Sequence, residues 1–209
     1  VTSIGREAFY KCSSLTSVTI PDSVTTIGYD AFYGCSSLTS VTIPDSVTTI
    51  GSCAFYNCSS LRSVIIGSGV TEIGDCVFYD CTGELIVNCN IPPSASGYDD
   101  GAFYHSKFTS VTIGDGVTTI GRYAFYICSS LTSVTIPDSV TSIGREAFYK
   151  CSSLTSVYCK AVTPPTGDYD MFPYNVSDRK IYVPMESVEA YKSATHWSSY
   201  ASDIVGYDF

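Results

Sequence analysis

The chain has 209 residues, with 20 Asp or Glu against 11 Lys or Arg, which gives a formal net charge of −9 at pH 7. This acidic balance argues against nucleic acid as a partner, because contacts to phosphates need clustered Lys and Arg. No apolar run approaches the ~20 residues that a transmembrane helix needs. The N-terminus also lacks the basic and apolar regions of a signal peptide, so we expect neither element in this sequence.

An internal repeat dominates the sequence. Its unit is represented by residues 15–37, LTSVTIPDSVTTIGYDAFYGCSS, and residues 1–18 recur unchanged at 140–157. A unit of this size cannot bury its apolar side chains alone, whereas stacked units can, so the chain is predicted to be a solenoid. One phenylalanine marks each unit, at spacings between 22 and 25 residues: Phe9, Phe32, Phe55, Phe78, Phe103, Phe125, Phe148 and Phe172.

Each unit is predicted to contain two extended stretches and one tight turn. Val18 and Ile20 alternate with Ser and Thr, which is typical of a short strand with one buried face. Pro21 ends this strand, because proline has no N–H and its φ is fixed. A second extended stretch closes at Gly28, which permits a corner with positive φ. Residues 31–35 are then expected to form a short helical or 3₁₀ turn.

The fifth coil, near residues 82–108, departs from the regular unit. We align its Ile91-Pro92 pair with the Ile-Pro pair that ends the strand of a regular unit. This alignment places Cys89 in the core of the strand and the two flanking asparagines on its outward face. Residues 92–101 are then expected to form a modified convex side of the coil.

The regular pattern ends after Cys159. Residues 161–170 are rich in Pro, Gly and Asp and are predicted to form a loop. Residues 181–184 form a last predicted strand, and an apolar helical period follows. We therefore expect one domain, in which residues 1–184 form a solenoid of about eight coils and residues 185–209 cap its exposed core edge.

The unit resembles the leucine-rich repeat. Its pattern, L-x-x-V-x-I-x-x-x-V-x-x-I-G-x-x-A-F-x-x-C-x-x, is similar to L-x-x-L-x-L-x-x-N-x-L, and its A-F-x-x-C and I-G signatures resemble the 23-residue BspA-like (treponemal-type) subclass. The resemblance covers nearly the whole chain, including residues 181–201, which are similar to the tail of such arrays. The asparagine of the general pattern is replaced by Ser or Gly, so we expect serine or the backbone to satisfy that turn.

The resemblance implies an α/β solenoid, a right-handed β-α superhelix with one short strand per coil on its concave face and a helical C-terminal cap. It also implies a bacterial cell-surface or secreted protein of the kind found in oral and gut microbes, where some members bind host matrix proteins. Because the fold is a scaffold, residues that give function have to be sought on its surface.

The outward side chains of the predicted strands form the first candidate surface, because solenoids bind ligands along their concave face. Most of these side chains are Ser or Thr, and the alternative is a solvated face whose residues merely suit a strand. Residues that break this monotony are the better candidates for contacts. The candidate ligand-binding residues are Thr19, Thr42, Arg62, Ile65, Asn88, Asn90, Thr112, Thr135 and Tyr158.

A column of tyrosines forms the second candidate surface, which we call the tyrosine strip. Each member follows the core phenylalanine of its unit. Such a strip suits a protein or glycan partner, and the alternative is a half-buried ladder that stabilises the convex turn. The strip consists of Tyr10, Tyr33, Tyr56, Tyr79, Tyr104, Tyr126 and Tyr149.

The ten cysteines are expected to be free thiols that pack as small hydrophobic groups. Most occupy recurring columns, and parallel side chains of neighbouring coils have poor torsions for a disulfide. A disulfide between Cys53 and Cys76 and a zinc site stay open as alternatives. We expect no metal, no cofactor and no catalytic residues, because the chain has two His and no Walker loop, G-x-S-x-G or H-E-x-x-H motif.

These features favour a protein- or glycan-binding, adhesin-type module whose partner is a host extracellular protein or glycan. The alternative is a passive spacer in a larger surface protein. An enzyme is not favoured, because a catalytic site needs a non-repeated cluster of titratable groups. Val1 begins in the middle of a unit, so we expect more chain before it. We expect a monomer, with the open N-terminal strand edge as the place where copies would associate.

Overall fold

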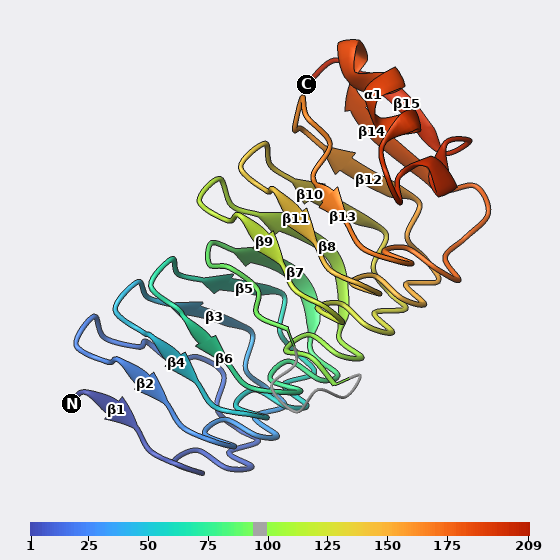
Figure 1. Ribbon diagram of the computed structural model, residues 1–209. Helices are drawn as coiled ribbons and strands as arrows, with labels where there is room; N and C mark the ends of the chain where they lie inside the picture. The colour runs from blue at the N-terminus through green and yellow to red at the C-terminus, as the bar shows by residue number, and fades with distance from the viewer. Residues whose placement is uncertain (94–99) are drawn as a thin grey trace.

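The computed structural model describes residues 1–93 and 100–209, and it stacks the chain into parallel coils from the N-terminus to the C-terminus (Figure 1). One strand of almost every coil joins a single parallel sheet with the order β15-β14-β12-β10-β8-β7-β5-β3. Its strands are β3 (Ser40–Ile43), β5 (Ser63–Ile66), β7 (Thr82–Val87), β8 (Lys107–Ile113), β10 (Ser133–Ile136), β12 (Ser156–Cys159), β14 (Lys180–Pro184) and β15 (Ile204–Tyr207).

A second ladder of two-residue strands runs along the stack. Its first part has the order β1-β2-β4-β6 and its second part the order β13-β11-β9. Between the two parts, Ile91 makes only an isolated bridge to Ile120. Pro92 and Pro93 follow Ile91 and have no N–H to donate, which explains the break. The strands are β1 (Ser3–Ile4), β2 (Thr26–Ile27), β4 (Thr49–Ile50), β6 (Glu72–Ile73), β9 (Thr119–Ile120), β11 (Ser142–Ile143) and β13 (Thr166–Gly167).

The structure confirms the predicted solenoid. It differs from the expectation in the segment that closes each coil, residues 30–35 in the second coil, which we call the arc. The regular arcs are turns rather than helices, whereas the second extended stretch of most units forms a two-residue strand, as predicted. In the second coil, Asp30 has φ of 55° and Gly34 has φ of 69°. Left-handed residues four positions apart interrupt a right-handed helix, so the arc folds as successive turns.

Hydrogen bonds join each arc to the arc of the next coil. Phe32 donates its N–H to the carbonyl of Ala54 at 2.7 Å, and Gly34 donates to the carbonyl of Tyr56 at 2.8 Å. In the last coil, the N–H of Phe172 instead donates to the hydroxyl oxygen of Tyr200 at 3.1 Å. A side chain of the cap thus takes the place of the next coil's carbonyl.

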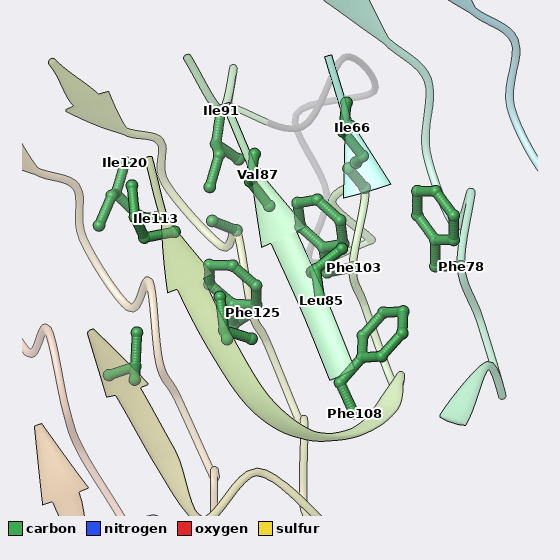
Figure 2. Close-up of a cluster of buried hydrophobic side chains, with 14 of the residues drawn as sticks. Ile66, Phe78, Leu85, Val87, Ile91, Phe103, Phe108, Ile113, Ile120 and Phe125 are labelled. Atoms are coloured by element: carbon green, nitrogen blue, oxygen red, sulfur yellow. The ribbon is translucent and has the colours of Figure 1, made fainter. Parts of the chain in front are cut away.

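The core consists of identical side chains stacked in ladders. The rings of Phe55 and Phe78 lie 5.4 Å apart, and those of Phe103 and Phe125 lie 4.9 Å apart, in nearly parallel planes. Figure 2 shows the rings of Phe78, Phe103 and Phe125 among aliphatic side chains of both ladders, around Leu85. Burial of a whole aromatic side chain contributes roughly 2–3 kcal/mol, so the phenylalanine column is a main source of stability.

The strand of the fifth coil lies in a different register from the predicted one. Leu85 pairs with Val64 and Val87 pairs with Ile66, so these two residues fill the core positions that the alignment gave to later residues. The strand shifts register at a bulge after Gly83, whose φ is 94° and which lies against the backbone of Arg62. The extra residues therefore come after the strand. Most of the predicted convex segment, residues 94–99, lies outside the described residues.

Serine satisfies the turn that follows the strand, as expected. Ser46 Oγ donates to the carbonyl of Val24 at 2.8 Å, and Ser139 Oγ donates to the carbonyl of Val117 at 2.8 Å. Each bond links a coil to the coil before it. Such bonds contribute about 0.5–1.5 kcal/mol each, so serine does the work that asparagine does in the general pattern.

The C-terminal cap consists of η1 (Met185–Ser187), α1 (Val188–Ser193), η2 (Ser198–Tyr200) and strand β15. Two fully buried side chains attach it to the last coil. Tyr191 donates its hydroxyl to the carbonyl of Ala161 at 2.8 Å, and Trp197 Nε1 donates to the carbonyl of Pro165 at 2.7 Å. The helix was predicted from the sequence, whereas the strand that extends the sheet into the cap was not.

Candidate functional site

The outward face of the eight-stranded sheet carries a continuous row of side chains. The pairing register aligns one residue from each strand, and we call this set the central row. At ~4.8 Å per strand, its seven steps span roughly 34 Å. The central row consists of Thr42, Ile65, Ile86, Thr112, Thr135, Tyr158, Tyr182 and Val205.

Three tyrosines gather at the C-terminal end of this face, and we call them the aromatic patch: Tyr158, Tyr182 and Tyr207. The rings of Tyr158 and Tyr182 stack 4.8 Å apart. The ring of Tyr207 meets both edge-on, with centroid distances of 5.6 Å and 5.4 Å. Tyr207 is 42% exposed and Phe209 beside it is 49% exposed. Tyrosine of this kind offers a large apolar surface with a polar tip, which suits recognition.

A second apolar group on this face is the pair Ile65 and Ile86, which are neighbours across β5 and β7. Ile86 is 37% exposed, although isoleucine is usually buried. The sequence identified Ile65 but missed Ile86, because the alignment of the fifth coil assigned the strand to later residues. Alternation of Leu85 and Val87 around Ile86 was the signal for the correct register.

Of the remaining residues predicted for the strand face, some lie in the central row and others lie outside the strands. Thr112 and Thr135 lie between the two apolar groups, and Thr42 lies at the N-terminal end of the central row. Thr19 is exposed one coil earlier, outside the strands of the sheet. Arg62 is exposed and directly precedes β5.

Asn88 and Asn90 are not on the outward face, which corrects the predicted placement. They lie after β7, where their side chains bond to the backbone. Asn88 Nδ2 donates to the carbonyl of Ile66 at 3.1 Å. Asn90 Oδ1 accepts from the N–H groups of Thr118 and Thr119 at 2.8 Å and 3.1 Å, and from the Thr118 hydroxyl at 3.2 Å. Both residues therefore stabilise the turn beside the break in the second ladder.

The tyrosine strip forms a stacked ladder on the arcs. Ring centroids lie 5.1 Å apart for Tyr10 and Tyr33 and 4.4 Å apart for Tyr56 and Tyr79. Burial, together with the neighbouring phenols, raises the pKa of Tyr56 to about 12. The stack is disturbed at the fifth coil, where the ring of His105 stacks on Tyr79 at 4.7 Å. Most of these rings are half-buried and cover one another, an arrangement that supports the arcs.

The cysteines are recorded as free thiols. In the main column, each buried thiol donates to the carbonyl of a phenylalanine in the preceding coil, as Cys58 does to Phe32 at 3.2 Å. Ser106 fills one position of this column, with its hydroxyl 3.2 Å from the thiol of Cys128. Burial raises the pKa of Cys76 to about 12 and that of Cys81 well above its ordinary range. These thiols therefore stay protonated and act as packing groups.

A metal site and a membrane-spanning helix are both absent from the part of the chain that the structure describes. Among residues 1–93 and 100–209, no three His, Cys, Asp or Glu side chains are grouped so that they hold a metal ion. The same residues contain no helix with the length and apolar character needed to cross a bilayer.

Comparison with solved structures finds other bacterial leucine-rich repeat proteins. A leucine rich repeat protein of T. pallidum is 27% identical, with a TM-score of 0.48, and the match covers 75% of this chain and 62% of that one. One from Bacteroides ovatus is 22% identical, with a TM-score of 0.40, covering 80% of this chain and 63% of that one. A leucine rich cell surface protein of Faecalibacterium prausnitzii is 23% identical, with a TM-score of 0.34, covering 100% and 84%.

This chain spans less than two thirds of the first two of those proteins. No curated protein matches it significantly. The family model of the BspA type leucine rich repeat region matches with six copies, over residues 2–129 and 96–195. These matches span nearly all of the repeats described above, and the chain belongs to the BspA-type leucine-rich repeat family.

Proposed function

We propose that this chain is a non-catalytic recognition module that binds a protein or a glycan on the outward face of its eight-stranded sheet. The observation that carries the proposal is the aromatic patch, where the partly exposed Tyr207 packs against the stacked pair Tyr158 and Tyr182. Exposed aromatic clusters on a rigid scaffold are typical of interaction sites.

The spacing of the apolar groups favours a ligand that runs along the solenoid. Ile86 and Tyr158 are separated by three strand steps in the register, which is roughly 14 Å. The residues between them, Thr112 and Thr135, offer hydroxyls for polar contacts. A ligand that touches both groups therefore has to be extended, such as a glycan chain or a protein surface.

The proposed setting is a bacterial cell surface or the secreted fraction, with a host extracellular protein or glycan as the partner. Membership of the family supports this setting through the resemblance described above. The acidic net charge of −9 also favours a neutral or basic partner over nucleic acid.

The test is a binding screen against immobilised matrix proteins and glycans by biolayer interferometry. The double variant Tyr158→Ser and Tyr182→Ser is expected to lower the affinity for any saturable ligand at least about tenfold, because aromatic anchors carry 2 kcal/mol or more. The double variant Tyr10→Ser and Tyr33→Ser is the matched control, since it removes the same groups from the tyrosine strip.

Loss of binding in the control alone would move the site to the tyrosine strip. Unchanged affinity in both variants would remove the aromatic patch from the proposal. The absence of any ligand in the screen would favour a structural spacer, which the identical text of residues 1–18 and 140–157 independently supports.

A further inference from the structure

Strand β15 forms an edge of the eight-stranded sheet and has a neighbour on one side only, within residues 1–93 and 100–209. The N–H of Ile181 donates to the carbonyl of Asp203 at 2.9 Å, and Ile181 lies opposite Ile204. In a parallel ladder, the direction of the N–H and C=O groups alternates along the strand. Asp203 and Val205 therefore face β14, whereas Ile204 and Gly206 direct their backbone groups away from the sheet.

The surroundings of this edge are exposed. Residues 205–209 are all solvent-exposed, and the side chain of Ile204 alone in β15 is buried. Gly206 has no side chain on the inward side, where Met185 and Val188 lie close to its backbone. The outward N–H and C=O of Gly206 are thus accessible, and they offer one donor and one acceptor to an added strand.

A pocket of about 430 Å³ opens at the carboxyl ends of the three neighbouring strands β12, β14 and β15. Its walls include Pro184, Met185 and Phe209, and Met185 is 67% exposed. Two carboxylates, Glu186 and Asp208, also line it, against the single cation Lys160. The pocket therefore combines an apolar lining with a negative rim.

We propose that the edge of β15 and this pocket bind an extended peptide segment that adds a strand to the sheet. The segment carries an apolar side chain near one end for the pocket and Lys or Arg beside it for Glu186 and Asp208. The pocket shares Tyr207 with the aromatic patch, but the edge itself uses backbone groups that point along the sheet rather than side chains that stand on its outward face.

The chemistry of the edge distinguishes this occupant from others. The edge presents a backbone donor and acceptor at every second residue. Another extended backbone can form hydrogen bonds with both, which is the basis of strand addition. A glycan does not repeat such a pattern. A second copy of the chain brings a further charge of −9, so electrostatic repulsion opposes it, whereas a basic peptide is attracted.

The probe is a fluorescein-labelled hexapeptide of alternating Lys and Val, measured by fluorescence anisotropy. Gly206→Pro removes the outward N–H and leaves the groups that bond to β14 in place. Gly206→Ala is the matched control, because it brings the same Cβ towards Met185 but keeps the N–H. We expect Gly206→Pro to weaken binding about fivefold to tenfold relative to Gly206→Ala, as for the loss of a backbone hydrogen bond.

Two further measurements keep the result decisive if the proline variant folds poorly. The double variant Glu186→Gln and Asp208→Asn is expected to weaken binding and to reduce its salt dependence, since it removes the negative rim. A hexapeptide that is N-methylated at alternate amides is expected not to bind, because it keeps the side chains but lacks the donors.

Equal affinity of the proline and alanine variants, or binding of the N-methylated peptide, would overturn the proposal. A concentration-dependent dimer that Gly206→Pro abolishes, detected by light scattering, would assign the edge to a second copy and overturn it as well. The double variant Ile65→Ser and Ile86→Ser, which changes the outward face away from the pocket, is expected to bind the probe normally, so failure of the face site and failure of the edge site are told apart.

Discussion

At the scale of single residues, burial decides the chemistry of side chains that look identical in the sequence. Cys35 and Cys53 belong to different columns, and Cys35 is fully buried whereas Cys53 is partly exposed. Burial, with the nearby thiol of Cys58, raises the pKa of Cys35 to about 12. The buried thiols are therefore packing groups at neutral pH. Because their pKa is raised only in the folded chain, their ionisation is coupled to unfolding.

The thiols predict a loss of stability in alkali. Burial raises the pKa of Cys35, Cys76 and Cys89 to about 12, from an ordinary value of 9.0. A thiol with a raised pKa stabilises the folded chain below the ordinary value, and this contribution disappears as the pH rises towards the folded value. We expect Tm, measured with a reductant present, to be constant between pH 7 and 8.5 and to fall between about 9 and 12. A constant Tm up to pH 11 would contradict this account.

At the scale of elements, the irregular fifth coil shows how a few extra residues are tolerated. The strand keeps its place in the larger sheet, and the second ladder breaks instead. Asn90 stabilises this break by accepting three hydrogen bonds from Thr118 and Thr119. A single amide thus bonds to the chain where the second ladder is interrupted.

Replacing that amide tests its role. Asn90→Ala removes the acceptor of the Thr118 and Thr119 N–H groups, which are exposed and bond to water instead, so we expect the free energy of unfolding in urea to fall by about 0.5–1.5 kcal/mol. Binding at the aromatic patch is expected to stay unchanged, because Asn90 does not lie on that face. Thr112→Ser, an exposed change on the outward face, is the control and should shift stability by less than about 0.5 kcal/mol. Equal stabilities of the two variants would show that the amide bonds contribute little.

The elements also show what the sequence could predict. The period of Phe32, Phe55 and Phe78 was enough for the solenoid and its core, because identical side chains can be buried only by stacking. Ile86 was missed because the alignment placed the strand four residues too late, so the outward positions went to Asn88 and Asn90 instead of Glu84 and Ile86. Tyr207 was missed because β15 lies outside the repeat, where no second copy of the text indicated a strand. The left-handed arcs were missed since residues such as Asp30 and Cys53 do not usually adopt positive φ.

At the scale of the whole molecule, the repeats allow a whole unit to be deleted without changing the pattern of the remaining sequence. Val117 and Val140 occupy equivalent positions, so deletion of residues 118–140 joins the chain in register. This deletion removes β9 and β10 and leaves the aromatic patch untouched. It also brings Ile86 one strand closer to Tyr158, by roughly 4.8 Å.

The deletion separates the ways in which the solenoid is used. We expect the shortened chain to fold, with circular dichroism like that of the parent and a lower Tm, because repeat stability is a sum over coils and interfaces. A ligand held by the aromatic patch alone should bind with unchanged affinity in interferometry. A ligand that also contacts Ile65 and Ile86 should bind more weakly, whereas a spacer function should decline with length. A deletion variant that does not fold would show that the coils are not independent units.

The interlocking bonds run in both directions between neighbouring coils. The side chains of Ser46, Ser139 and Cys58 donate to carbonyls of the preceding coil. The backbone N–H of Phe32, in the arc, donates instead to a carbonyl of the following coil. A chain that leaves the ribosome N-terminus first therefore presents each new coil with acceptors already in position. In the last coil, the N–H of Phe172 donates to the hydroxyl oxygen of Tyr200. The hydrogen bonds of this coil are therefore complete only once the cap has been synthesised.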